Sequence, residues 1–152
     1  MTRLIASSTE ALALVGEPLG PSDGVLIDQS RIYAFADATN DHQWIHVDAE
    51  RAASGVFGAT IGHGYLTLAL LPYFSSRIYK LDFGSARVNY GTNKVRFPSP
   101  VLAGSVLTAT ATIAEVRTDR QGTFLRVGYT VTADGAAKPA CVAETITLVI
   151  GE

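Results

Sequence analysis

Three long runs of alternating apolar and polar residues occupy the second half of the chain. They cover 105–115, 124–132 and 142–150. In the first, one face of an extended chain would carry only apolar side chains: Leu107, Ala109, Ala111 and Ile113. Period-two alternation is typical of antiparallel strands with one buried face. Turn residues at 120–122 and 134–135 separate the runs. We expect a fourth strand over 87–97, closed by two prolines.

A single strongly apolar helix is expected before these strands. The segment from Gly64 onward is apolar nearly all round, which is typical of a buried helix. Pro72 should kink or limit it, and the pattern resumes through Tyr79. Two short helices are expected earlier, over 31–38 with Ser30 as a possible N-cap, and over 48–53. One buried helix against a curved antiparallel sheet is an α+β fold.

Composition limits the partners. The 152 residues fit one domain, which we expect to span 1–152. A net charge of −2 argues against a nucleic-acid binder. The longest apolar run, 66–71, is far shorter than the roughly 18 residues of a membrane span. Charged residues are only 17% of the chain, which suggests that another copy covers part of the surface. The lone Cys141, in an apolar run, fits an inert buried thiol and a cytoplasmic protein.

The segment 40–46 contains the residues best suited to acid–base chemistry. Asp41 and His46 lie five positions apart, between a short helix and a glycine-rich stretch. A loop of this kind can turn both side chains toward one point. An Asp and a His that converge on one water form an acid–base pair, because their ordinary pKa values differ.

A second feature follows at Gly62-His63-Gly64, where the buried helix begins. Backbone N–H groups at a helix N-terminus lack partners within the helix, and glycine allows a ligand to approach them. This arrangement could stabilise an oxyanion. Together with the acid–base pair, it supplies what is needed to add or remove water next to a carbonyl.

Structural roles are the alternative for the same residues. Asp41 could cap a turn after the short helix, and Gly64 could be a packing glycine. His42 and His63 are interpreted as structural, with His63 orienting the turn through a hydrogen bond. The three histidines with Asp41 resemble a metal site, but the turn residues around Trp44 argue against a zinc-binding helical face, so we expect no metal.

These residues carry a family resemblance. The order Asp41-x4-His46 followed by His63-Gly64 resembles the signature of the MaoC-like, or R-specific enoyl-CoA hydratase, family. The later stretch 89–98 resembles that of the nodulation-protein-N-like subgroup. The resemblance extends from about Asp28 to Ile150.

The resemblance implies a hot-dog fold, in which a curved antiparallel sheet wraps a long central helix, and a homodimer with the two sheets joined at their edges. It implies reversible hydration of trans-2-enoyl-CoA to (R)-3-hydroxyacyl-CoA. Asp41 and His46 would hold and activate the water, and the backbone N–H of Gly64 would bind the thioester oxygen. No metal or redox cofactor is implied, because the CoA thioester itself carries the acyl group.

The sequence departs from the family pattern in two places. Gln43 and Trp44 replace its Asn-Pro pair, and Trp44 could reshape the acyl pocket. Pro72 stands where some members carry a serine. Asn93, expected to point inward with Val95 and Phe97, is a candidate replacement. Tyr65 is a further candidate for the substrate pocket.

Other functions on the same fold stay open. A hot-dog thioesterase commonly uses a carboxylate on the central helix, and no Asp or Glu lies between Gly64 and Lys80. A non-catalytic acyl-thioester-binding protein would not need both Asp41 and His46. The chain length of the acyl group, and the choice between CoA and acyl carrier protein, are not fixed by these patterns.

Overall fold

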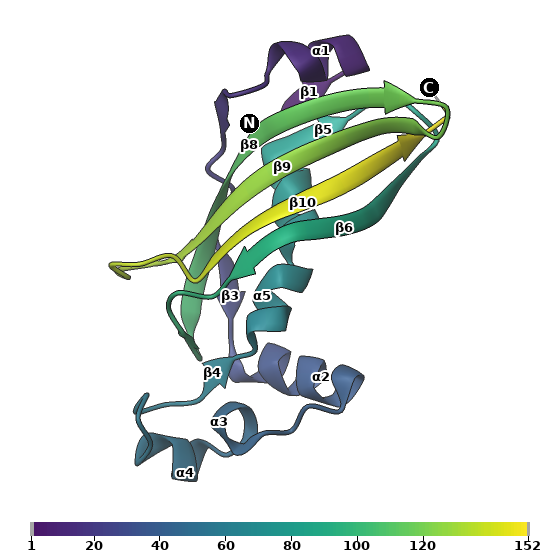
Figure 1. Cartoon of the computed structure of the whole chain (residues 1–152). Helices are drawn as coiled ribbons and strands as arrows, with labels where there is room; N and C mark the ends of the chain where they lie inside the picture. Colours follow the sequence, from purple (N-terminus) through teal and green to yellow (C-terminus); the bar gives the residue numbers. More distant parts are fainter. Residues whose placement is uncertain (1, 152) are drawn as a thin grey trace.

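The structure is a computed structural model that describes residues 2–151 (Figure 1). Its helices are α1 (Ser8–Ala13), α2 (Gln29–Thr39), α3 (Trp44–Val47), α4 (Ala49–Ala53), α5 (Gly64–Ala69) and α6 (Leu71–Ile78). Its strands are β1 (Arg3–Ile5), β2 (Pro18–Leu19), β3 (Val25–Ile27), β4 (Ile61–Gly62), β5 (Tyr79–Leu81), β6 (Ala86–Arg96), β7 (Val101–Leu102), β8 (Ser105–Asp119), β9 (Gly122–Ala133) and β10 (Cys141–Ile150).

The main sheet has the order β2-β8-β9-β10-β6, and β3 pairs with β8 as well. All pairings within this sheet are antiparallel. The four expected strands correspond to β6, β8, β9 and β10, within a few residues at each end. Alternation predicted the buried face of β8 and β9 correctly, because its members are buried: Leu107, Ala109, Ala111, Ile113, Leu125, Val127, Tyr129 and Val131.

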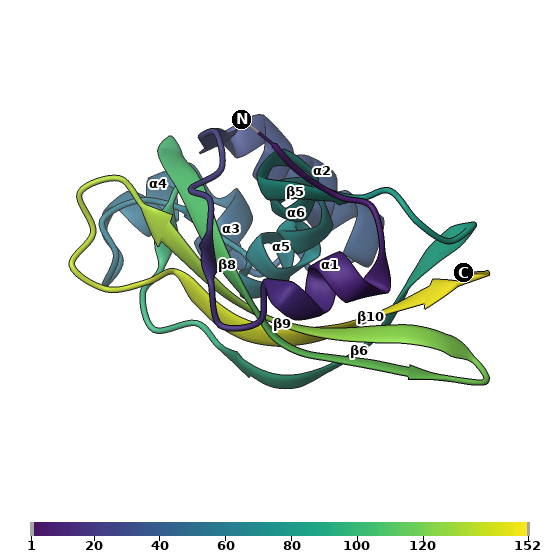
Figure 2. The same ribbon diagram turned by 90° about the horizontal axis from the view of Figure 1, so that it is seen from above.

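The concave face of the sheet encloses the central helix (Figure 2). This helix is two segments, α5 and α6, because Pro72 stands in the first turn of α6 and lacks the N–H that a continuing helix would use. Phe74 is fully buried, and Leu66, Leu71 and Ile78 are nearly so. The kink expected at Pro72 is therefore confirmed, and the α+β architecture with it.

Strand β6 is the exception to the buried pattern. Its residues are exposed except for one that is half-buried. It pairs with β10 on one side, and no described strand pairs with its other side. A long unpaired strand edge presents free backbone N–H and C=O groups to another chain.

Helices α2, α3 and α4 form a separate layer beyond the N-terminal end of α5 (Figure 1). The N-cap of α2 is Asp28, not Ser30: the Asp28 carboxylate accepts from the Arg31 N–H, and Ser30 donates to Asp28 instead. A charged acceptor two residues earlier captures the free N–H of the first turn. The helix expected over 48–53 is α4, capped by Asp48.

Candidate active site

The turn after α2 places Asp41 where it can reach the helical layer and α5. Asn40 adopts a left-handed conformation at the C-cap of α2, with φ of 57°. Asparagine tolerates this conformation better than most residues. The chain then forms α3, a short helix that alternation and spacing did not predict. The change of direction at Asn40 is what brings the two ends of the motif together.

His46 lies in α3 and is buried, with 6% of its surface exposed. Its Nδ1 lies 2.7 Å from the carbonyl oxygen of Ile61. A carbonyl can only accept, so Nδ1 carries the hydrogen and Nε2 of the neutral ring carries a lone pair. Burial lowers the pKa of His46 below its ordinary value, and the nearby His63 lowers it further, against the Ile61 hydrogen bond and the Asp41 charge. His46 is thus prepared to accept a proton at Nε2.

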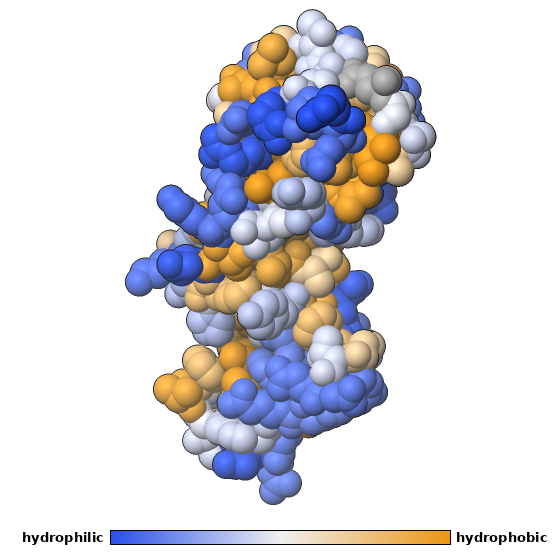
Figure 3. Space-filling view, turned by 45° about the vertical axis from the view of Figure 1, so that its right-hand side comes forward, coloured by the Kyte–Doolittle hydropathy of each residue, from blue (hydrophilic) through white to orange (hydrophobic). Residues whose placement is uncertain are grey.

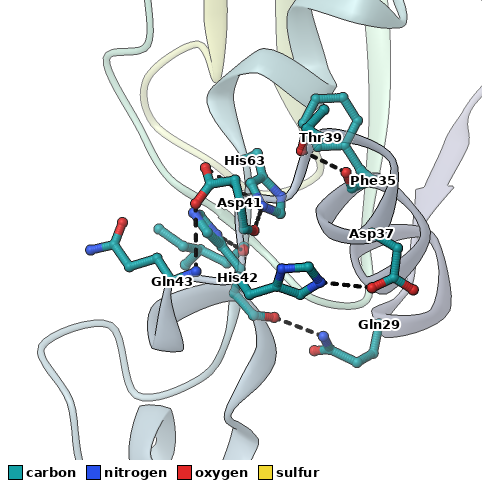
Figure 4. Close-up of polar contacts among 10 residues, drawn as sticks. Gln29, Phe35, Asp37, Thr39, Asp41, His42, Gln43 and His63 are labelled. Carbon is teal, nitrogen blue, oxygen red and sulfur yellow. Dashed lines mark hydrogen bonds and ion pairs between the residues drawn. The ribbon is translucent and has the colours of Figure 1, made fainter.

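Asp41 combines a hydrogen-bonded backbone with an accessible carboxylate. Its carbonyl oxygen accepts a 3.0 Å hydrogen bond from Nε2 of His63. Its carboxylate is 54% exposed, with Oδ2 3.9 Å from the same nitrogen. Figure 4 shows the carboxylate beside the His63 ring and turned away from His42. The anchored backbone fixes the direction in which the carboxylate points.

His63 stacks on His46, with ring centroids 3.7 Å apart and an interplanar angle of 22°. The hydrogen bond expected from His63 to the turn is present. One carboxylate oxygen of Asp41 and one ring nitrogen of each histidine all lie within 4.8 Å of one another. A water that hydrogen-bonds at about 2.8 Å can bridge two atoms at this separation. The three atoms are therefore close enough for a single water molecule to bridge them.

Asp41, His46 and His63 lie close enough together to hold a metal ion. One nitrogen of each ring already donates its hydrogen to a backbone carbonyl, His63 Nε2 to Asp41 and His46 Nδ1 to Ile61, so each neutral ring keeps one lone pair. Ligands that share a zinc ion at about 2.1 Å need lone pairs aimed at one point. We expect these groups to hold a water and no metal ion.

Gln29 and Thr60 fix the position of α3 relative to the chain before β4. The Gln29 side-chain amide donates to the carbonyl of His46 at 2.8 Å. The Thr60 hydroxyl donates to the side-chain oxygen of Gln29 in a short hydrogen bond. Sequence reasoning missed both residues, because neither stands in a motif and their contacts span 17 and 31 positions.

Gly64 begins α5 next to the histidine stack. It lines a cavity of about 350 Å³ together with His46, Thr67 and Phe97. A Cβ at position 64 would meet the Phe97 ring at 2.8–3.0 Å, so any larger residue would push that ring away. Glycine at this position leaves the first backbone N–H of the helix accessible beside His46. The structure thus brings all three residues predicted as catalytic to one place.

The other candidates lie elsewhere. Trp44 packs against α4, with the Arg51 guanidinium 4.3 Å from its ring. Tyr65 is 71% exposed and meets Phe97 edge-on, at 6.1 Å between ring centroids. His42 pairs with Asp37 at 2.7 Å on the surface. Contacts of Trp44 and Tyr65 with substrate stay predictions.

The inward orientation expected of Asn93 is wrong. The register of β6 against β10 skips Asn93, which bulges between the residues paired with Glu144 and Thr145. A bulge shifts a residue out of the simple alternation. Asn93 therefore turns outward, where its amide donates to Glu144 at 2.6 Å.

A curved antiparallel sheet wrapped around a central helix is the architecture of a hot-dog protein. A structure from Archaeoglobus, called a monoamine oxidase regulatory protein, has a TM-score of 0.80 at 22% identity, over 100% of this chain and 99% of that one. The (R)-hydratase from A. caviae has a TM-score of 0.73 at 21% identity, over 89% and 96%. These similarities establish the hot-dog fold.

The family follows from sequence comparison. Residues 10–135 match the model of the MaoC-like domain. The chain is 50% identical over 145 residues to 3-hydroxyacyl-thioester dehydratase Z of Mycobacterium tuberculosis, covering 95% of this chain and 96% of that protein. It is 42% identical to nodulation protein N of Rhizobium meliloti, over 93% and 90%. The chain belongs to the MaoC-like dehydratase family. The expected resemblance and the expected hydro-lyase class are confirmed.

Proposed function

We propose that the protein is an (R)-specific hydratase, which interconverts a trans-2-enoyl thioester and a (R)-3-hydroxyacyl thioester. The observation that supports this most directly is the convergence of the Asp41 carboxylate and the buried His46 at a spacing of one water, beside the start of α5. The family's reaction class agrees with this chemistry.

The water lies between Asp41 and the Nε2 lone pair of His46. His46 takes one proton as the water oxygen bonds to C3 of the enoyl group, and a proton is delivered to C2 by the same pair. The elements of water are thereby added across the double bond, and the enzyme returns to its starting protonation state. Dehydration is the reverse. The low pKa of His46 keeps its base form available at neutral pH.

Negative charge that develops on the thioester oxygen during the reaction needs a hydrogen-bond donor to stabilise it. The backbone N–H of Gly64, at the start of α5, supplies one in this proposal, because the helix itself leaves it without a partner. The adjoining cavity of about 350 Å³ would hold the reacting part of the substrate.

Two further expectations belong to the proposal. The CoA thioester is the substrate carrier, and the reaction needs no metal or other cofactor. Dialysis against EDTA should leave the hydration rate unchanged, and a rate that returns only with added Zn²⁺ or Mg²⁺ would contradict this.

A homodimer is the expected assembly, joined at the free edge of β6. Val88 and Tyr90 on β6 and Val142 on β10 are exposed, at 42%, 58% and 42%. Figure 3 shows hydrophobic residues gathered across the middle of one face, with hydrophilic residues above and below. None of the helices in residues 2–151 could span a membrane. A cytoplasmic location stays a prediction.

The deciding experiment mixes the protein with crotonyl-CoA or a longer trans-2-enoyl-CoA. Loss of the conjugated enoyl absorbance is followed while free thiol is measured in parallel. Hydration without thiol release is the expected result. Thiol release without hydration would identify a thioesterase. Tight binding of the acyl-CoA with neither loss of enoyl absorbance nor thiol release would identify an acyl-thioester-binding protein.

A further inference from the structure

A second, larger cavity lies along the central helix and shares no lining residue with the cavity beside Gly64. It is a groove of about 1340 Å³ between α5–α6 and the middle of strands β6 and β10. The strand wall includes neighbouring pairs of the β6–β10 register, namely Thr145 with Thr92 and Thr147 with Asn89. In Figures 1 and 2 the helix crosses the concave side of the sheet at this level.

The helical wall of the groove begins where the reaction centre ends. Leu68, Pro72 and Ser75 line it, and they follow Gly64 at four, eight and eleven positions. Residues at such intervals share one face of a helix. At 1.5 Å per residue, Ser75 lies about 16 Å from Gly64 along this face. A thioester bound at Gly64 would therefore direct an extended acyl chain into the groove.

The chemistry of the wall changes along its length. On the helical side, the part nearest Gly64 is apolar, with Leu68, Ala69, Leu71 and Pro72, while threonines of β6 and β10 line the strand side. The far part is rich in hydroxyl groups, with Ser75, Ser76, Tyr79 and Tyr129. The end of a plain alkyl chain could form no hydrogen bond with these hydroxyl groups, whereas a ligand oxygen could bond to their remaining lone pairs and hydrogens.

The hydroxyl groups at the far end form one cluster. The Tyr79 and Tyr129 oxygens lie 2.8 Å apart, and both rings are 4% exposed. Burial raises the pKa of both phenols, with the Ser75 hydroxyl as a hydrogen-bonding neighbour of each. They therefore stay protonated at neutral pH. Each hydroxyl oxygen has two lone pairs and one hydrogen, so the cluster can both donate to and accept from a ligand oxygen.

The charged side chains at this end are already engaged. Arg87 donates to the backbone carbonyls of Leu81 and Phe83. Lys80 pairs with Asp82 at 2.8 Å. A carboxylate would find these cations occupied, whereas a neutral oxygen group needs only the hydroxyl cluster.

We propose that the far end of this groove selects acyl chains that carry a hydroxyl or another neutral oxygen group near their end, through Ser75, Tyr79 and Tyr129. This inference rests on the proposed function, because it takes the thioester to lie at Gly64. The apolar part of the wall accommodates the carbons between the two polar ends. An extended chain of about a dozen carbons would span the distance of about 16 Å.

The test uses three acyl-CoA ligands of equal length: dodecanoyl-CoA, its ω-hydroxy derivative and its ω-carboxy derivative. Dissociation constants are measured by calorimetry on the Asp41→Asn protein, so that no turnover is needed. The ω-hydroxy ligand should bind about two- to tenfold more tightly than dodecanoyl-CoA, as one or two net hydrogen bonds would give. Ser75→Ala and Tyr129→Phe should abolish that ratio while leaving dodecanoyl-CoA binding nearly unchanged.

Thr118→Ala is the matched control. It removes a hydroxyl bonded to another hydroxyl on the same sheet, at 2.9 Å from Thr123, away from the groove. It should leave the ratio unchanged. Equal binding of dodecanoyl-CoA and its ω-hydroxy derivative would overturn the proposal. Preference for the ω-carboxy ligand would also overturn it, because it would show that Arg87, and not the hydroxyl cluster, recognises the end of the chain. Turnover of trans-2-dodecenoyl-CoA by the wild-type protein is measured separately, so that failure of the hydratase assignment is distinguishable from failure of this one.

Discussion

The sheet and the segment from Asp28 to Gly64 bury their side chains in different ways. The inward faces of β8 and β9 are apolar except for the hydroxyl of Tyr129, which bonds that of Tyr79, and they share one hydrophobic core with α6. The segment instead buries His46, Thr60 and His63, whose positions depend on a few hydrogen bonds and one ring stack. Stability should therefore depend on the sheet, and catalysis on the segment. Substitutions in the two regions can separate these contributions.

The largest effect on turnover is expected for His46→Gln. Glutamine keeps a polar side chain of similar length but removes the imidazole that accepts the proton. The hydration rate should fall by about 10²–10⁴-fold, as for loss of a general acid–base group. Circular dichroism and the melting temperature should show a folded protein. A variant that retained the wild-type rate would place the base elsewhere.

The reverse pattern is expected for Leu125→Ala on β9. Leu125 is fully buried in the apolar core. Its truncation should lower the free energy of unfolding by about 2–5 kcal/mol, through lost burial and a residual cavity. The rate per folded molecule at a low assay temperature should stay close to that of the wild type. A rate loss as large as that of His46→Gln would show that the two regions are not separable.

His63→Phe should sharpen the distinction within the segment. Phenylalanine keeps a ring against His46 but loses the hydrogen bond to the Asp41 carbonyl. It also removes Nδ1 of His63, which is buried without a hydrogen-bond partner among residues 2–151. Stability should change little, because a bond is lost and an unsatisfied acceptor disappears with it. We expect kcat to fall about tenfold through misplacement of Asp41. Unchanged kcat would show that the hydrogen bond of His63 has only a structural role.

The smallest effect concerns pH. The pKa of His46 is lowered on folding, so the folded protein binds fewer protons than the unfolded chain as pH falls through the ordinary value of about 6.5. The stability contributed by neutral His46 is therefore present above this pH and is lost progressively below it. The rate should hold its plateau to a more acidic pH than an ordinary histidine would allow. A kinetic pKa above the ordinary value would contradict the burial argument.

Local patterns predicted the sheet well because alternation within a strand reflects which face of that strand is buried. Leu107 and Val127 could be placed on the inner face without knowledge of their neighbours. The motif predicted that Asp41 and His46 act together, but not that His46 lies on a helix or stacks on His63. The hydrogen bonds that hold the two histidines join residues 15 and 22 positions apart, which local patterns do not reveal. The orientation of Asn93 was predicted wrongly because a bulge in β6 shifts it out of the simple alternation. Gly91, two residues earlier in the strand, is the residue type that could have signalled it.

The most direct test of the central claim is the hydration rate of Asp41→Asn. Asparagine preserves the shape and the backbone contact of Asp41 with His63 but removes the negative charge that holds the water. The account predicts a folded variant with an unchanged acyl-CoA dissociation constant and a hydration rate at least about 100-fold below that of the wild type. A variant that hydrates crotonyl-CoA at the wild-type rate would contradict the assignment of this site.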